Sequence, residues 1–159
     1  MLPDTILGIS LGTCRLGLAV GNNTGLIHWQ IKGFDETYSK KKAKKIWRAI
    51  EQTVLRYGIT VIGMKIPPKS CRSDGLAHCL KYITQRALEK EIILFFYDIE
   101  AIEQHFVKAE AKNKAKVAEC IADKYPQLKR EFFKLEKCQY HMKIFEAVAS
   151  MDLASLETF

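Results

Sequence analysis

The sequence has 159 residues, 48% hydrophobic and 27% charged, which is enough for one globular domain with a buried core. With only 9 Gly and 4 Pro, the composition excludes a collagen-like, low-complexity or disordered chain. Lys and Arg outnumber Asp and Glu by 25 to 18, and the net charge of +7 permits an anionic partner.

The sequence also bears on membrane association and on the cellular compartment. No apolar run approaches the roughly 20 residues of a membrane span, and no export signal is recognisable at the N-terminus. The five cysteines are odd in number and follow no regular spacing, which argues against a disulfide framework. We therefore expect a soluble, cytoplasmic protein that does not associate with a membrane.

The first third of the chain predicts an antiparallel ribbon of three strands. The strand-like runs are residues 5–11, 15–21 and 26–34, and the gaps between them are short enough only for hairpins. In the third run, Ile27, Trp29 and Ile31 alternate with polar residues. This period of two predicts a strand with one solvent-exposed face, at the edge of the sheet.

The middle of the chain alternates between predicted helices and strands. A helix over 38–57 ends at Gly58, a buried strand follows over 60–66, and a helix over 76–90 leads into a buried strand over 92–98. Helices between buried strands imply parallel crossovers. The last third predicts a helical stretch over 100–122 interrupted around Asn113, a boundary at Pro126, a short piece through Lys137, and a helix over 141–156.

These elements predict an α/β fold in one domain over residues 1–159. The sheet is expected to be mixed and to have about five strands, three antiparallel and then two parallel, with helices on both faces. No internal repeat and no long linker divides the chain.

The opening segment ILGISLGTCRLGLAV resembles the first hairpin of RuvC-type Holliday-junction resolvases, which belong to the ribonuclease H-like superfamily. Residues 97–128, with the basic run at 112–117, resemble the DNA-contacting region of that family. Glu146-Ala147-Val148-Ala149 resembles its acidic C-terminal helix. The resemblance implies a ribonuclease H-like fold, branched DNA as a partner, and homodimerisation.

The residues at the positions of the family's catalytic acids argue against its chemistry. Those enzymes cut phosphodiesters with carboxylates that gather divalent metal ions. By resemblance, the position of the first acid holds Ser10, that of the second falls at or beside Met64-Lys65, and those of the last two hold Lys143 and Glu146. Only Glu146 remains, and Lys65 would repel a metal ion.

Relocated acids are the alternative source of a nuclease site. Asp98 ends a predicted parallel strand, where open α/β sheets place their sites, and the pair of Asp98 and Glu146 is the candidate catalytic set. Asp152 is a further acid of this kind. In the simpler interpretation, Asp98 caps the following helix.

Basic clusters are the candidate nucleic-acid contacts. Each phosphate that a cation neutralises releases condensed counterions, and Tyr38 and Trp47 could stack on unpaired bases. The alternative is a solvated basic face, with Trp47 in the core. The candidate residues are Lys40, Lys41, Lys42, Lys44, Lys45, Lys65, Lys69, Arg72, Lys114 and Lys116.

Two weaker patterns lead to no expected site. Residues 8–13 also resemble the phosphate-binding turn of actin-like ATPases and sugar kinases, but those proteins close two lobes over ATP and this chain is long enough for one. Cys71, His78 and Cys79 lack the second cluster of a zinc site.

Three functional hypotheses remain open. The first is a nucleic-acid-binding protein without metal-dependent cleavage and without a cofactor. The second is an active, magnesium-dependent endonuclease. The third is a protein-interaction module whose basic character is incidental.

Overall fold

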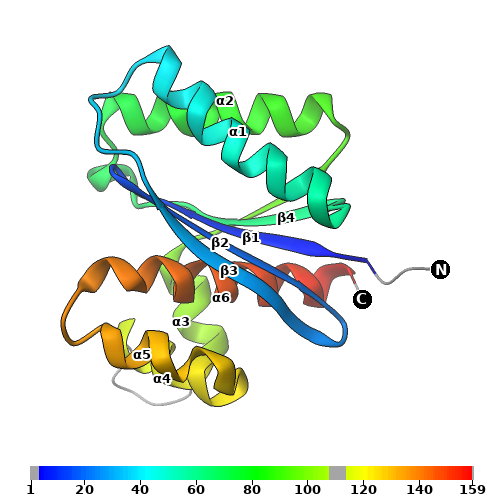
Figure 1. The fold of residues 1–159 in the computed structure, drawn as a ribbon, viewed down its shortest axis with the longest axis vertical. Coiled ribbons are helices and arrows are strands. Elements are labelled where there is room, and N and C mark those ends of the chain that lie inside the picture. Colours follow the sequence, from blue (N-terminus) through cyan, green and yellow to red (C-terminus); the bar gives the residue numbers. More distant parts are fainter. Residues whose placement is uncertain (1–3, 108–113, 159) are drawn as a thin grey trace.

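The centre of the fold is a five-stranded sheet in the order β3-β2-β1-β4-β5, covered by helices on both faces (Figure 1). A computed structural model describes residues 4–107 and 114–158. The strands are β1 (Ile6–Leu11), β2 (Arg15–Asn22), β3 (Gly25–Gly33), β4 (Val61–Lys65) and β5 (Ile93–Tyr97). The helices are α1 (Lys40–Tyr57), α2 (Asp74–Glu89), α3 (Ile99–Phe106), α4 (Lys114–Lys124), α5 (Lys129–Lys134) and α6 (Met142–Thr158).

The strand pairing confirms the predicted fold class. β1, β2 and β3 form an antiparallel ribbon, and β4 pairs in parallel with both β1 and β5. β3 lies at one edge, as its alternating pattern predicts. The short gaps after β1 and β2 leave room only for tight turns, whereas each parallel connection carries a helix.

Each face of the sheet has its own hydrophobic core. Leu7, Ile9 and Leu11 of β1 belong to the core that α1 and α2 cover. Ile6 of the same strand belongs to the core on the other face, which α6 covers together with α3 and α4. Because side chains alternate along a strand, Ser10 lies on the α6 face and its neighbour Leu11 on the α1 face.

Helix α1 presents its apolar stripe to the sheet and begins at a side-chain cap. Ser39 accepts a hydrogen bond from the backbone N–H of Lys42, and Gly58 ends the helix in the left-handed conformation. Helix α2 begins in the same way, because Ser73 accepts a hydrogen bond from the backbone N–H of Leu76. Its first residue is Asp74, two residues before the predicted start. Trp47 is buried, so the core interpretation of this side chain is confirmed.

Strand β5 differs from the prediction. Its apolar sequence predicts a strand buried on both sides, but β5 is the second edge of the sheet, and Ile93 and Phe96 are 56% and 45% exposed. The prediction was wrong because, within residues 4–107 and 114–158, β5 pairs only with β4 and leaves Ile93 and Phe96 partly open to solvent.

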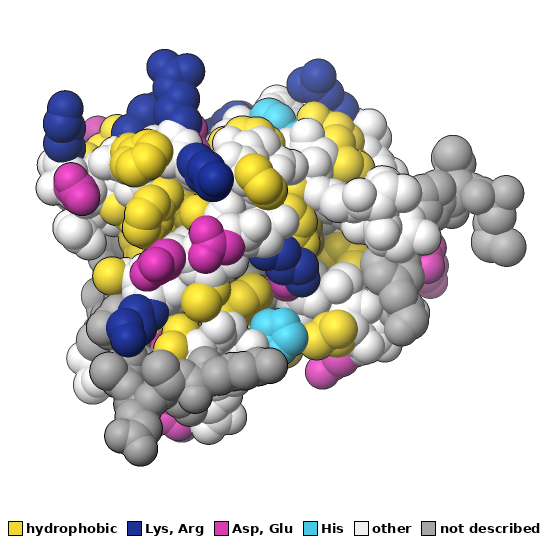
Figure 2. All heavy atoms as spheres, turned by 90° about the horizontal axis from the view of Figure 1, so that it is seen from below, with side chains coloured by type: hydrophobic (Ala, Val, Ile, Leu, Met, Phe, Trp, Pro, Cys, Tyr) yellow, Lys and Arg dark blue, Asp and Glu magenta, His cyan; other side chains and the backbone are white. Residues whose placement is uncertain are grey.

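The last third forms α3 to α6 on one face of the sheet. The boundary at Pro126 is confirmed, since α4 ends at Lys124, whereas the predicted interruption at Asn113 lies outside the described residues. None of the described helices is long and apolar enough to cross a bilayer. Seen from the side of α4 and α5, Lys and Arg side chains lie among Asp, Glu and hydrophobic ones, so this face carries both signs of charge (Figure 2).

Candidate functional site

Two neighbouring parallel strands bring the first two predicted site residues together. Ser10, near the end of β1, is in register with Lys65, the last residue of β4. Both side chains lie on the α6 face and both are buried. The carboxyl ends of parallel strands are where open α/β sheets place their sites.

Helix α6 supplies the other two residues by packing very closely on the sheet. A Cβ atom at Gly8 would lie 1.9 Å from the carbonyl oxygen of Ala147, and one at Gly63 would lie 2.2 Å from that of Ser150. Only glycine allows this approach, because any side chain would force the helix away. The close packing places Glu146, which is 1% exposed, directly over the ends of β1 and β4.

We name the four residues Ser10, Lys65, Lys143 and Glu146 the Lys–Glu cluster. The Lys65 Nζ atom lies 2.8 Å from Glu146 Oε2, and Lys143 Nζ lies 3.4 Å from Glu146 Oε1. The Ser10 hydroxyl donates a hydrogen bond of 3.4 Å to Glu146 Oε1. Of the two residues that the resemblance left open at the second position, Lys65 faces Glu146, whereas Met64 belongs to the core on the opposite face of the sheet.

The Lys–Glu cluster does not fit a divalent metal ion. It holds one carboxylate and two ammonium groups, so its formal charge is +1 where a magnesium site needs several carboxylate oxygens. At an effective dielectric constant near 20, two unit charges about 4 Å apart interact by about 4 kcal/mol, and a divalent ion would feel about twice that repulsion from each ammonium group. Within residues 4–107 and 114–158, no group of three His, Cys, Asp or Glu side chains is placed to hold a metal ion.

The relocated acids do not join the Lys–Glu cluster. Asp98 is the N-cap of α3, where its Oδ1 atom accepts a hydrogen bond of 2.8 Å from the backbone N–H of Ala101, so the capping interpretation is confirmed. Asp152 lies further along α6 and accepts hydrogen bonds from Lys124 and Tyr125. Burial, followed by the bond to Asp152, raises the pKa of Tyr125 well above its ordinary value.

The predicted basic residues divide into exposed and buried groups. Lys42 and Lys65 are each 5% exposed, so neither is presented to a large partner as the prediction required. The position of Lys42 in the helical stripe of Ile46 and Ala49 is the sequence signal for its burial, and the lysine-rich run conceals it. The exposed candidates are Lys40, Lys41, Lys44, Lys45 and Lys69, while Arg72 and Lys116 are half-buried. Lys114 begins α4, but its side chain, like Lys108 and Lys112, lies outside the described part of the chain.

The exposed lysines lie at the same end of the sheet as the Lys–Glu cluster. Helix α1 begins at this end, and so does the connection from β4 to α2 that carries Lys69 and Arg72, at the left of Figure 1. Arg72 donates a hydrogen bond from Nε to the carbonyl oxygen of Pro67, which fixes that connection. Lys45 is paired with Glu36 at 2.8 Å.

Comparisons with known proteins agree with this geometry at the level of the fold. No protein-family model and no curated protein sequence matches the chain. The structure of Thermus thermophilus RuvC in complex with a Holliday-junction substrate is similar with a TM-score of 0.68 and 17% identity, over 93% of this chain and 90% of that one. Another Thermus thermophilus RuvC structure gives a TM-score of 0.67 and 14% identity, over 92% and 90% of the two chains. The chain therefore has a RuvC-like, ribonuclease H-like fold.

Proposed function

We propose that this protein binds nucleic acid, branched DNA included, on a RuvC-like scaffold and does not cut it by a metal-dependent mechanism. The observation that carries the proposal is the Lys65–Glu146 ion pair, which occupies the position where the resemblance predicts a metal-binding carboxylate pair. The proposal separates two properties that the resolvase family combines, namely binding and cleavage.

The loss of cleavage follows from the charge of the Lys–Glu cluster. The single carboxylate is already neutralised at 2.8 Å and 3.4 Å by two ammonium groups. A metal ion would have to displace Lys65 from a buried position and leave that ammonium group without a counterion, which is costly. Ser10 offers only a hydroxyl group, a poor substitute for a carboxylate toward Mg²⁺.

The retention of binding is supported by charge and by fold. The net charge is +7, and Lys40, Lys41 and Lys44 are exposed and, among the described residues, form no ion pair. They lie at the start of a helix with no acidic residue in its first turn, where the helix dipole disfavours cations. The negative phosphate groups of a nucleic acid would offset this unfavourable interaction by pairing with the lysine charges. The structural likeness to a RuvC chain bound to a Holliday junction makes branched DNA the first substrate to test.

Fluorescence anisotropy with a labelled four-way junction, a duplex and a single strand tests the proposal. We expect binding that weakens as salt increases, and tighter binding to the junction than to the duplex. The triple variant Lys40→Gln, Lys41→Gln, Lys44→Gln should lower the slope of log affinity against log salt by up to about 3. A matched triple of exposed lysines on other elements, Lys81→Gln, Lys129→Gln and Lys137→Gln, should change it less.

Cleavage is measured in the same samples with magnesium present. We expect the junction to remain intact. Magnesium-dependent cutting that Glu146→Gln abolishes would refute the inactive scaffold and favour the endonuclease hypothesis. Absence of binding to all three substrates at low salt would refute both nucleic-acid hypotheses and leave an interaction module.

A further inference from the structure

A cavity of about 380 Å³ lies at the same end of the sheet but on the opposite face from the Lys–Glu cluster. Its walls come from the turn between β1 and β2, the residues that precede α1, and the first turns of α1 and α2. Most of the lining is apolar, with Leu11, Tyr38, Ile46 and Leu76 as the main side chains. This size and lining are typical of pockets for small molecules.

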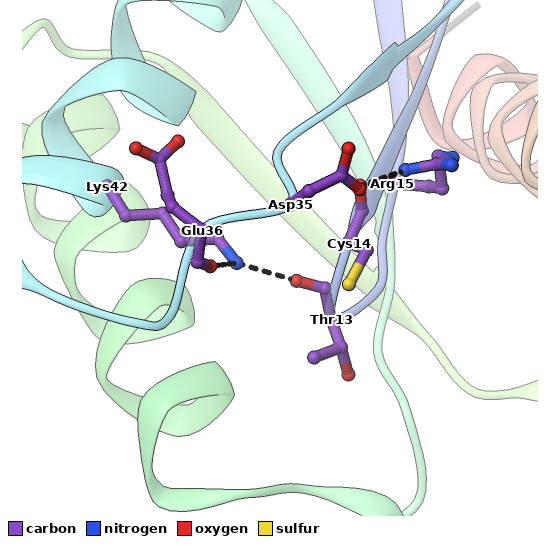
Figure 3. Close-up of polar contacts among 6 residues, drawn as sticks. All are labelled: Thr13, Cys14, Arg15, Asp35, Glu36 and Lys42. Carbon is purple, nitrogen blue, oxygen red and sulfur yellow. Dashed lines mark hydrogen bonds and ion pairs between the residues drawn. The ribbon is translucent and has the colours of Figure 1, made fainter.

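The one buried charge in this lining is the ammonium group of Lys42. The side chain is 5% exposed, and its Nζ atom donates hydrogen bonds of 2.9 Å and 2.7 Å to the carbonyl oxygens of Thr13 and Glu36 (Figure 3). An ammonium group has three N–H donors, so these two bonds leave one donor over. Both acceptors are neutral, so neither balances the charge.

The two carboxylates beside the cavity are held by other cations. Asp35 forms an ion pair with Arg15 at 2.8 Å, and Glu36 forms one with Lys45 at 2.8 Å. The carboxylate of Glu36 points away from the ammonium group of Lys42, which contacts only the backbone oxygen of that residue (Figure 3). Among the described residues, Lys42 therefore has no carboxylate partner.

The neighbouring thiol does not supply a negative charge either. Burial raises the pKa of Cys79 to about 11, although the charge of Lys42 acts in the opposite direction. The thiol is thus protonated and neutral near pH 7. A buried cation without a counterion is costly, and a bound anion is the direct way to offset that cost.

We propose that this cavity binds a small organic anion, a carboxylate or phosphate monoester on an apolar body, with the anionic group on Lys42. The apolar walls contact the body of the ligand, and the third N–H of the ammonium group donates a hydrogen bond to its anionic oxygen. The start of α1, which has no acidic residue in its first turn, adds a favourable field for an anion. This site adjoins the proposed nucleic-acid surface at the start of α1, but Lys40, Lys41 and Lys44 do not line the cavity, and the Lys–Glu cluster lies on the opposite face of the sheet.

Phenyl phosphate and benzoate are the probes, and benzyl alcohol is the control that keeps the apolar ring without the charge. We expect calorimetric titration to give saturable one-to-one binding of at least one of the two anions and none of benzyl alcohol. Lys42→Met should weaken that binding about tenfold or more, because a charge-assisted hydrogen bond is lost. Lys81→Met, an exposed lysine of α2 outside the cavity, should leave it unchanged. The anion that binds more tightly identifies the source as phosphate or carboxylate.

A second measurement on the unaltered protein keeps the test independent of how the variant folds. Cys14 lines the cavity and is exposed, whereas Cys138 is half-buried on another part of the chain. The anion that binds should slow modification of Cys14 by iodoacetamide, read by mass spectrometry, and leave Cys138 unaffected. Failure of both anions to bind at millimolar concentration, or binding that survives Lys42→Met, would overturn the proposal.

Discussion

Replacing Glu146 by Gln is the most direct perturbation of the Lys–Glu cluster. Glutamine has nearly the volume of glutamate, so no cavity forms and the change is almost purely one of charge. Lys65, only 6% exposed, then loses the counterion that lies 2.8 Å from its Nζ atom. Removal of one partner from a buried ion pair costs about 3–5 kcal/mol, and we expect the free energy of unfolding to fall by that amount.

Replacing Lys65 by Met should cost less, about 2 kcal/mol. The carboxylate of Glu146 keeps Lys143 at 3.4 Å and the Ser10 hydroxyl at 3.4 Å, so its charge is not left without a partner. In the double variant the remaining ammonium is that of Lys143, which is 23% exposed and can reach water. The double variant should therefore lose clearly less stability than the sum of the single variants, with a coupling of about 2 kcal/mol.

Urea denaturation followed by far-ultraviolet circular dichroism measures these values, provided that the slope against urea concentration stays the same in all variants. The exposed pair of Arg86 and Glu89 on α2 is the control, and Glu89→Gln should change stability by less than about 0.5 kcal/mol. A loss below about 1 kcal/mol for Glu146→Gln, or additive single variants, would refute the reasoning that this cluster is a tightly coupled buried ion pair.

Three further predictions concern packing, metal and pH. Gly63→Ala should lower the free energy of unfolding by about 3 kcal/mol, measured in urea, because its Cβ would lie 2.2 Å from the carbonyl oxygen of Ser150; an unchanged urea midpoint would contradict the close packing of α6. About 10 mM MgCl₂ should not raise the melting temperature, whereas a magnesium site with a dissociation constant of about 100 μM would raise the free energy of unfolding by about 2.7 kcal/mol. Burial and the nearby Arg56 lower the pKa of His28 from 6.5, so the folded state favours the neutral imidazole. Stability should therefore fall as the pH drops below about 6.5, and His28→Gln should remove that loss when urea midpoints at about pH 7.5 and pH 5.5 are compared.

Much of the fold could be predicted because local pattern determines it. The short connections between the first three strands allow only hairpins, and the alternation in residues 26–34 indicates a strand with one solvent-exposed face. The pairing of β1 with β4 is different, because residues 6 and 61 are far apart in sequence and no local period connects them. The structure shows that pairing, which places Ser10 beside Lys65, and no pattern in the sequence specified it.

The burial of individual charges was the hardest feature to predict. Lys42 stands in the run KKKAKK, where composition favours exposure, yet helical periodicity places it on the stripe that faces the core. Lys65 is the last residue of β4, in which every residue is buried, and its partner Glu146 lies 81 positions away in the sequence, on α6. A single sequence shows which face a residue occupies but not which charge it meets there.

The Lys–Glu cluster also explains why a single substitution should not recover metal binding. In a carboxylate site the metal ion supplies the positive charge that holds the acids together. Here Lys65 supplies that charge from within the chain, so the burial of Glu146 does not require a metal ion. Lys65→Glu alone would place a second carboxylate beside Glu146 while Ser10 still lacks one and Lys143 still neutralises the site. Recovery of a metal site therefore requires changes at Ser10, Lys65 and Lys143 together, because the three positions share one charge balance.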